Sequence, residues 1–412
     1  MNGSGAWHAK QAWLGRPATD VLIEAEGGVI KSIVEGTECP PGVTQLPGWT
    51  IPGFANVHSH AFQHIIRGIS EREGGNFWEW RRQMYSAAVG FDPPGYLKYS
   101  VRVFREMVEA GITAVGEFHY LHRYGNELGE ALITAARQVG IRITLIDACY
   151  LRGGLDGRQL DDVQQTFSDG DAERWAMRMD ELRDGAGVRI AAAIHSVRAV
   201  DPASMRTVAA WARRRGAPLH VHLAEQSAEV EECMAIEGCT PAELLEREGI
   251  LGPDLTAIHA IHLSDHDISL LGGAKVSICA CTTTERDLGD RVGRLRELCD
   301  AGCLVTVGSD SNAMIDMLEE ARGLELDQRR ATGRRLLHAP EELLRAATID
   351  GMRALGWDAG ELRPGMLADF VSIEPAHGLL RELDPASLLF GCLDCDHEVK
   401  VVVVGGKTVV SK

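Results

Sequence analysis

The chain has 412 residues, of which 45% are apolar and 25% charged, proportions typical of ordinary folded proteins rather than of disordered or collagen-like chains. Its 42 lysines and arginines against 59 acidic residues give a net charge of −17, which argues against nucleic acid or an anionic membrane as a partner. No apolar run approaches the ~18 residues of a spanning helix, and the N-terminus lacks a basic start and an apolar signal core, so we expect a cytoplasmic protein.

From about Thr50 to Leu355, short β-branched apolar runs alternate with amphipathic stretches, the pattern of repeated strand–helix units. Repeated units of this kind imply a parallel sheet. Eight strands are predicted, and they start at Trp49, Ile112, Ile141, Val188, Pro218, Leu255, Lys275 and Leu304. Eight repeats in about 250 to 300 residues are typical of a (β/α)₈ barrel. No Gly-x-Gly-x-x-Gly follows any of these strands, which disfavours a doubly wound dinucleotide-binding sheet.

The two ends of the chain, residues 1–50 and 360–412, carry short strands and turns and little helix. A small β-module built from both termini accounts for these strands. We therefore predict an α/β protein in two parts. Residues 51–359 are expected to form a (β/α)₈ TIM-type barrel, and residues 1–50 together with 360–412 a small β-sandwich domain.

Ten cysteines are scattered without a disulfide framework, and in a cytosolic chain they are expected to be reduced. Cys279 and Cys281 form a Cys-x-Cys, and Cys392 and Cys395 a Cys-x-x-Cys. Neither has a second pair at the spacing of a zinc site. Both pairs are predicted to pack as small buried side chains.

Histidines are concentrated in the segment ANVHSHAFQH, residues 55–64. On a strand, His58 and His60 point to the same side, which suits two ligands of one metal ion. Active sites of (β/α)₈ barrels lie at the carboxyl ends of the strands. Polar residues are predicted at four such ends: His58 and His60, then His220, His222 and Glu225, then His259 and His262, and finally Asp310. Four strands that end in this way favour a catalytic metal site.

The predicted ligands are His58, His60, His222 and Asp310. Within the fifth strand His222 lies nearer the strand end, and His220 remains an alternative. Nitrogen and oxygen donors of this kind suit zinc, although the same ligands accept iron or manganese. Barrels that hold two ions bridge them with a carboxylated lysine on the fourth strand, and the stretch IAAAIHSVRAV there has no lysine. One ion per subunit is therefore expected.

Such an ion lowers the pKa of bound water from about 15.7 toward about 7. Asp310 is then expected to take the water proton, Glu225 to protonate the leaving nitrogen, and His259 to stabilise charge on the tetrahedral intermediate. Hydrolytic release of ammonia or an amine from a C–N or C=N bond is the predicted reaction class. A purely structural zinc is disfavoured because structural sites are usually closed and rich in cysteine.

These residues resemble the amidohydrolase superfamily, whose members share the barrel, the β-sandwich made of both termini, and the metal-binding pattern His-x-His, His, His, Asp. Several segments more closely resemble those of the N-formimidoyl-L-glutamate deiminases of bacterial histidine degradation: NVHSHAFQH, NFWEWRRQMY, GEFHYLH, IHSVRAV, HVHLAEQ and GSDSN. The resemblance implies zinc-dependent hydrolysis of N-formimidoyl-L-glutamate, a small anionic amidine, to N-formyl-L-glutamate and ammonia. It also implies a homodimer.

Carried over by position, the metal ligands of the family fall on His58, His60, His222 and Asp310, its catalytic pair on Glu225 and His259, and its substrate-binding residues on Gln63, Arg81, Tyr120, His195 and Arg198. The physical chemistry agrees, because a substrate with two carboxylates needs arginines that fork onto them in an otherwise acidic protein. Arg82 adjoins Arg81, and the choice between the two rests on the register of the family.

One segment departs from the family. After the seventh strand the chain reads SICACTTTERDLGD, where Cys281 and Arg286 stand in place of the usual proline and alanine. Because the resemblance implies that this loop borders the substrate, we expect that a change here can shift the specificity. A zinc deaminase acting on a purine is the first alternative function. A purine deaminase is expected to stack aromatic side chains on its substrate. Only 6% of the residues in this chain are aromatic, which disfavours this alternative. A barrel without catalysis that serves as a scaffold is the second, and it predicts no stoichiometric metal.

Overall fold

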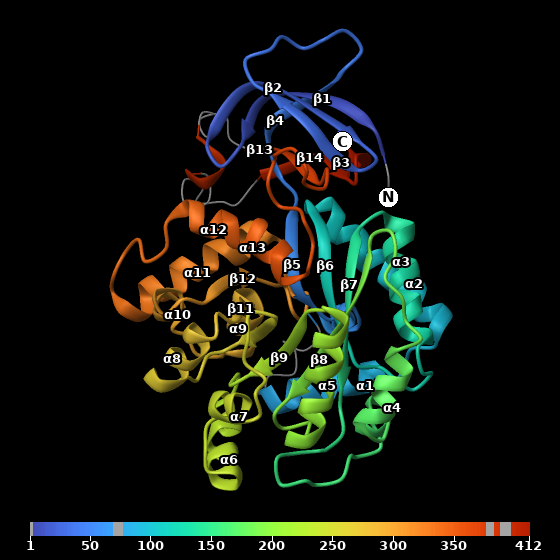
Figure 1. The fold of residues 1–412 in the computed structure, drawn as a ribbon, viewed down its shortest axis with the longest axis vertical. Coiled ribbons are helices and arrows are strands. Elements are labelled where there is room, and N and C mark those ends of the chain that lie inside the picture. Colours follow the sequence, from blue (N-terminus) through green and yellow to red (C-terminus); the bar gives the residue numbers. More distant parts are fainter. Residues whose placement is uncertain (1–2, 69–76, 376–382, 388–396) are drawn as a thin grey trace.

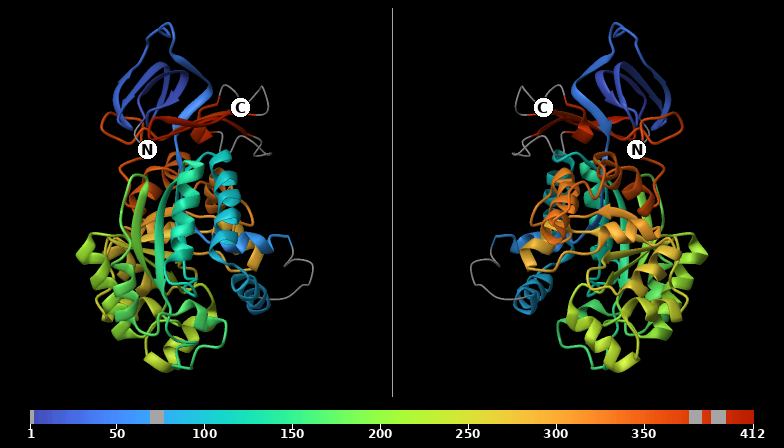
Figure 2. Two further views of the ribbon diagram at one scale, coloured as in Figure 1. Left: turned by 90° about the vertical axis from the view of Figure 1, so that its right-hand side faces the viewer. Right: turned by 90° about the vertical axis from the view of Figure 1, so that its left-hand side faces the viewer.

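The structure, a computed structural model, describes residues 3–68, 77–375, 383–387 and 397–412. An eight-stranded barrel is surrounded by helices, and a separate sheet lies above it in Figure 1. Figure 2 shows that the N-terminal and C-terminal strands lie together at this end of the molecule. The predicted fold class is thereby confirmed. Cys392 and Cys395 lie outside the described residues.

The barrel sheet has the order β12-β11-β10-β9-β8-β7-β6-β5, and its neighbouring strands run parallel. The strands are β5 (Phe54–Ser59), β6 (Ile112–His119), β7 (Arg142–Cys149), β8 (Val188–Ser196), β9 (Leu219–Leu223), β10 (Leu255–His259), β11 (Ser277–Ala280) and β12 (Leu304–Val307). The barrel closes just beyond β12, where Asp310 N donates to the carbonyl of His58 and His60 N donates to the carbonyl of Asp310, both at 2.9 Å. This closure brings two strand ends that are distant in sequence into one site.

Helices follow the strands and pack on the outside of the barrel (Figure 1). They are α1 (Phe77–Ala88), α2 (Pro93–Glu109), α3 (Glu127–Val139), α4 (Ala172–Met179), α5 (Pro202–Arg215), α6 (Ser227–Glu237), α7 (Pro241–Arg247), α8 (Asp265–Gly273), α9 (Thr282–Leu288), α10 (Leu295–Ala301), α11 (Met317–Thr332), α12 (Pro340–Ala346) and α13 (Ile349–Ala354), with 3-10 helices η1 (Ala61–Ile66) and η3 (Gln164–Phe167).

Local signals explain where these helices begin and end. At α5 the side chain of Asp201 accepts from Ser204 N, which caps the first turn, and Pro202 occupies the first helical position. Gly140 after α3 and Gly216 after α5 have φ of 89° and 60°, the left-handed conformation that glycine adopts most readily. In the part of the chain that the structure describes, no helix combines the length and apolar character needed to cross a membrane.

The second sheet has seven strands in the order β15-β14-β13-β4-β1-β2-β3. The strands are β1 (Gly5–Trp13), β2 (Pro17–Glu26), β3 (Val29–Val34), β4 (Thr44–Pro52), β13 (Phe370–Pro375), β14 (His397–Val404) and β15 (Lys407–Ser411). It encloses a small core of its own, in which Trp7 packs edge-on against Phe370 with ring centroids 5.2 Å apart. This core is separate from the larger one of the barrel.

The strand predicted to start at Trp49 is in fact two strands. Its first part ends β4 in the seven-stranded sheet, and its second part is β5 of the barrel. Gly53 lies between them, and a Cβ at this position would lie only 2.3 Å from Oγ1 of Thr113. Only glycine fits at this close approach, and it lies at the point where the chain passes from one sheet to the other. A continuous apolar run in the sequence could not indicate this crossing.

Candidate metal and catalytic site

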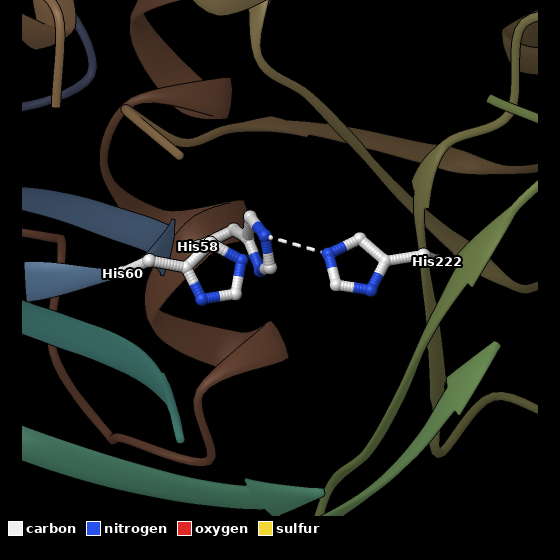
Figure 3. A group of neighbouring side chains, drawn as sticks. All are labelled: His58, His60 and His222. Carbon is white, nitrogen blue, oxygen red and sulfur yellow. Dashed lines mark hydrogen bonds between the residues drawn. The ribbon is translucent and has the colours of Figure 1, made fainter. Parts of the chain in front are cut away.

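Three histidines converge at the carboxyl end of the barrel. His58 lies on β5 and His60 directly follows this strand, and the ring of His222 faces them from β9 (Figure 3). Nε2 of His222 lies 3.1 Å from Nε2 of His58, and one ring nitrogen of each histidine lies within 4.8 Å of those of the other two. The geometry is that of three ligands directed at one point.

Backbone carbonyls orient two of these rings. Nδ1 of His60 lies 2.9 Å from the carbonyl oxygen of Phe118, and Nδ1 of His222 lies 2.9 Å from that of His195. A proton on Nδ1 leaves the lone pair of Nε2 free, which is the form that binds a metal. Burial lowers the pKa of all three histidines, that of His60 to about 3, so the rings are neutral at neutral pH.

Asp310 supplies a fourth donor. Its Oδ1 lies 3.3 Å from Nε2 of His58 and 3.4 Å from Nε2 of His60. Burial raises the pKa of Asp310, but His58, His60 and His259 outweigh it and hold the pKa well below the usual range. The backbone φ of Asp310 is 45° and that of His259 is 68°. A non-glycine residue in this region costs on the order of 1–3 kcal/mol, so strain is concentrated where two strand ends present side chains to the site.

These donors fit a divalent metal ion. Three imidazole nitrogens and one carboxylate oxygen form a set that zinc commonly accepts. The proton that His222 carries on Nδ1 directs the lone pair of its Nε2 at His58, a contact that a cation between the rings would stabilise. The structure therefore groups the four predicted ligands in a way that suits one ion.

Glu225 and His259 lie beside this group. Nε2 of His259 lies 3.7 Å from Oε1 of Glu225 and 3.9 Å from Oδ2 of Asp310, and its Nδ1 lies 3.2 Å from Oε1 of Glu285. Burial raises the pKa of Glu225 to about 7. Burial lowers the pKa of His259, but Glu225, Glu285 and Asp310 outweigh it and raise the value to about 10. The carboxyl of Glu225, which can act as an acid, and the positively charged imidazole of His259 therefore lie next to the predicted metal ligands.

Two further histidines, His64 from the histidine-rich segment and His220 from β9, lie outside the donor group. His220 is buried on β9 and does not belong to the group formed by His58, His60 and His222. His64 binds the hydroxyl of Tyr99 at 2.8 Å through its Nδ1. Of the two candidates on β9, the structure favours His222.

The predicted substrate-binding residues line one pocket with the catalytic groups. Among the residues that the structure describes, the following line this pocket: His60, Gln63, Trp80, Arg81, Met84, Tyr85, Tyr120, His195, Arg198, His222, Glu225, His259 and Asp310. Arg82 is 76% exposed and pairs with Glu79 at 3.4 Å. The structure thus distinguishes Arg81, in the pocket, from its neighbour at the surface.

Hydrogen bonds hold Arg81 in place. Its Nε and Nη2 donate to the hydroxyl of Tyr85 at 2.9 and 2.5 Å, and Nη2 also reaches the hydroxyl of Tyr150 at 3.3 Å. Gln63 donates to the hydroxyl of Tyr120 at 3.4 Å. The tyrosine hydroxyls orient the guanidinium toward the pocket, and neither Tyr85 nor Tyr150 was predicted to do so.

Two acidic residues with no predicted role position the functional groups. Glu229 accepts from Nε of Arg198 at 2.8 Å and from Ala224 N at 2.9 Å. Glu285 accepts from His259, as described above. Both lie in the first turns of helices, α6 and α9. Acidic residues are common there because of the helix dipole, so the sequence offered no signal that separates a positioning role from this ordinary one.

Arg286, in the segment that departs from the family, turns away from the pocket. It pairs with Asp327 at 2.9 Å and with Glu319 at 3.0 Å, and it is not among the described residues that line the pocket. Cys281 is fully buried just before α9. Arg286 therefore makes no direct contact with the pocket through which it could shift the substrate specificity.

A sequence model of the amidohydrolase family matches residues 49–409. Formimidoylglutamate deiminase from Pseudomonas aeruginosa is 32% identical to the chain, over 95% of this chain and 91% of that protein. A 5-methylthioadenosine/S-adenosylhomocysteine deaminase from Pelotomaculum thermopropionicum is 29% identical, over 88% of this chain and 80% of that protein. The solved structure of an amidohydrolase from Brucella melitensis has a TM-score of 0.92 at 33% identity, covering 99% of this chain and 95% of its own.

Proposed function

The chain belongs to the amidohydrolase family, and from this premise we propose that it hydrolyses N-formimidoyl-L-glutamate to N-formyl-L-glutamate and ammonia. The similarity to a deiminase and a deaminase supports hydrolysis of a C–N bond as the reaction class. The choice of substrate rests on one observation. Arg81 and Arg198 line the same pocket as Glu225 and three of the four predicted metal ligands.

The arginines match the charge of the proposed substrate. N-formimidoyl-L-glutamate has two carboxylates, and a guanidinium can bind a carboxylate through two parallel hydrogen bonds. In a chain with a net charge of −17, an anionic substrate needs such local cations. Glu229 fixes Arg198 from one side and the hydroxyls of Tyr85 and Tyr150 fix Arg81 from the other. Preorganised arginines bind at a lower entropic cost than mobile ones.

The catalytic steps follow from the positions of the acid and base groups. Zinc held by His58, His60, His222 and Asp310 would supply a water whose pKa falls from about 15.7 toward about 7. Asp310 is placed to accept a proton as the water attacks the amidine carbon. Burial raises the pKa of Glu225 to about 7, so this carboxyl can donate a proton to the departing ammonia near neutral pH. His259, between the two carboxyls, stabilises the charge that develops on the tetrahedral intermediate.

A purine or nucleoside deaminase is the second candidate. Trp80, Tyr85 and Tyr120 line the pocket, and aromatic rings of this kind could stack on a purine. The similarity to the deaminase from Pelotomaculum thermopropionicum also supports this reading. Two arginines in the pocket favour the dianionic amino acid derivative instead.

The test is release of ammonia by zinc-loaded protein from four substrates measured in parallel: N-formimidoyl-L-glutamate, N-formimidoyl-L-aspartate, guanine and adenosine. We expect fast turnover of the glutamate derivative alone. Turnover of a purine without turnover of the formimidoyl amino acids would replace the proposal with the second candidate. A protein that binds no stoichiometric metal and turns over none of the four would favour a scaffold.

Two adjacent arginines provide a matched control for the substrate-binding role. Arg81→Ala should raise KM for N-formimidoyl-L-glutamate by about 10- to 100-fold, since a hydrogen bond to a charged group is worth roughly 1.5–3 kcal/mol. Arg82→Ala removes a charge from the same helix at its exposed face and should leave KM unchanged. Equal effects of the two substitutions would contradict the assignment of Arg81.

A further inference from the structure

A second set of side chains that can bind a metal ion lies beside His58, His60 and His222. His259, Cys281 and Asp310 are all buried, and one donor atom of each lies within 4.8 Å of the donors of the other two. They come from successive barrel strands: His259 ends β10, Cys281 follows β11, and Asp310 lies beyond β12. The closed barrel thus brings an imidazole, a thiol and a carboxylate together.

The two oxygens of Asp310 face different donor sets. Oδ1 lies 3.3 and 3.4 Å from Nε2 of His58 and His60, whereas Oδ2 lies 3.9 Å from Nε2 of His259. A carboxylate placed in this way can bridge two ions, with one oxygen on each. No bridging lysine is needed, so the absence of one from the fourth strand does not limit the site to a single ion.

A fourth donor is available for the second position. Oε1 of Glu225 lies 3.7 Å from Nε2 of His259, while Glu285 holds Nδ1 of the same ring and keeps Nε2 directed at the two carboxylates. Nitrogen, sulfur and two oxygens complete a tetrahedral set for zinc or cadmium. Zinc bond lengths of about 2.0–2.3 Å place such donors roughly 3.3–3.8 Å apart. The donors of His259, Cys281 and Asp310, which lie within 4.8 Å of one another, therefore have to move inward, and the Glu225 carboxylate has to turn toward them.

We propose that His259, Cys281 and Asp310, with Glu225 as the fourth ligand, form a second metal site that prefers thiophilic ions, and that an ion bound there inhibits the enzyme. Binding releases the Cys281 thiol proton to water and engages Glu225 and His259. Both side chains are then withheld from the hydrolysis described above. The inhibition rests on the proposed function, whereas the binding does not.

Binding is tested on the full chain loaded with one equivalent of zinc and titrated with Cd²⁺. Zinc and cadmium are both counted after equilibrium dialysis, and the ultraviolet absorption of the cadmium–thiolate bond is followed. We expect wild type to retain its zinc, bind one cadmium and develop the absorption. In Cys281→Ser the absorption should be absent and cadmium affinity should fall by about 100-fold or more, because loss of a ligand exceeds the 10–100-fold effect of losing an outer partner.

Controls separate the thiol from general effects of substitution. Cys303→Ser changes another buried thiol next to β12 and should bind cadmium as wild type does. Cys281→Ala leaves no buried hydroxyl and is measured in parallel, in case the serine variant does not fold. Wild type that binds no second ion, or a Cys281 variant that binds it as tightly as wild type, overturns the proposal.

Inhibition is measured as ammonia release from N-formimidoyl-L-glutamate, relative to the rate of each variant without cadmium. Wild type and Cys303→Ser should lose activity as the second ion binds, and the Cys281 variants should need about 100-fold more cadmium, matching their loss of affinity. Full activity with the second ion bound overturns the inhibitory role. Cadmium binding as expected in a protein that does not turn over this substrate rejects the proposed function and leaves the metal site in place.

Discussion

Nδ1 of His259 lies 3.2 Å from Oε1 of Glu285, and the same oxygen accepts a hydrogen bond from Cys281 N at 3.0 Å. One carboxylate therefore connects the end of β10 to the start of α9. It sets the rotation of the His259 ring, so that Nε2 faces Glu225 and Asp310. It is also one of the carboxylates that raise the pKa of His259.

Glu285→Gln should lower kcat by about 10- to 100-fold with a smaller change in KM, the size typical of losing a group that orients a catalytic side chain. Because a negative charge beside His259 is removed, the pKa of this histidine should fall from about 10. The alkaline step of the rate profile that His259 sets, above the step that Glu225 sets near its pKa of about 7, should therefore move to lower pH. Steady-state rates across a pH series measure both effects. Asp327→Asn, which breaks an ion pair with Arg286 outside the pocket, is the control and should keep the wild-type profile.

Glu225→Gln should lower kcat by about 10²- to 10⁴-fold while zinc remains bound, since the amide cannot donate a proton to the leaving nitrogen. Rates and metal content are measured on the same samples. Glu231→Gln changes an exposed carboxylate on α6 and should retain wild-type activity. A Glu225 variant with unchanged kcat would remove this residue from the proposed mechanism.

The two histidines of β9 are separated by metal content. His222→Ala should lose stoichiometric zinc, because its Nε2 lies 3.1 Å from that of His58 at the centre of the donor group. His220→Ala should retain one zinc, with a lower melting temperature caused by the cavity that the substitution creates in the barrel. Zinc counted after dialysis, alongside thermal unfolding, distinguishes the two. The opposite pattern would assign the ligand to His220.

A buried ion pair outside the pocket predicts how stability depends on pH. Arg178 donates to both oxygens of Asp147, at 2.7 and 2.9 Å, and its side chain is only 10% exposed. Burial raises the pKa of Asp147, but Arg178 and His122 outweigh it and hold the value well below the usual range. The carboxylate therefore stabilises the fold above the unfolded pKa of about 3.9, and this contribution is lost as the pH falls through the folded pKa.

Arg178→Gln should lower the free energy of unfolding by about 3–5 kcal/mol at neutral pH, because it removes the guanidinium from a buried carboxylate that then keeps only its contacts with Trp175 and His122. The difference from wild type should narrow as the pH falls, since the Asp147 carboxyl of the variant, which has lost the guanidinium, takes up a proton. Urea unfolding at several pH values measures this difference. Arg174→Gln, which alters an exposed pair on the same helix, should have a small effect at every pH. A difference that widens in acid would contradict the argument.

The sequence by itself predicted eight barrel strands, which the structure confirms apart from the division of the first at Gly53, and it placed most of the candidate site residues at the ends of these strands. Strand periodicity puts His58 and His60 on one face, and a barrel places catalytic groups at carboxyl strand ends, so the pattern of polar residues after apolar runs located Glu225, His259 and Asp310 near one another. The family resemblance added Gln63, Arg81, Tyr120, His195 and Arg198, which the structure places around one pocket.

Only the tertiary structure decided which side chains meet across the barrel. Alternation along β9 gives His220 and His222 the same face, and the depth at which each lies depends on how the strands are staggered when the barrel closes. Glu229 and Glu285 look like ordinary acidic residues of a first helical turn until the fold sets Arg198 and His259 against them. The requirement for glycine at position 53 depends likewise on Thr113, a residue of another strand. Periodicity is a local property, whereas these relationships are contacts between segments far apart in the chain.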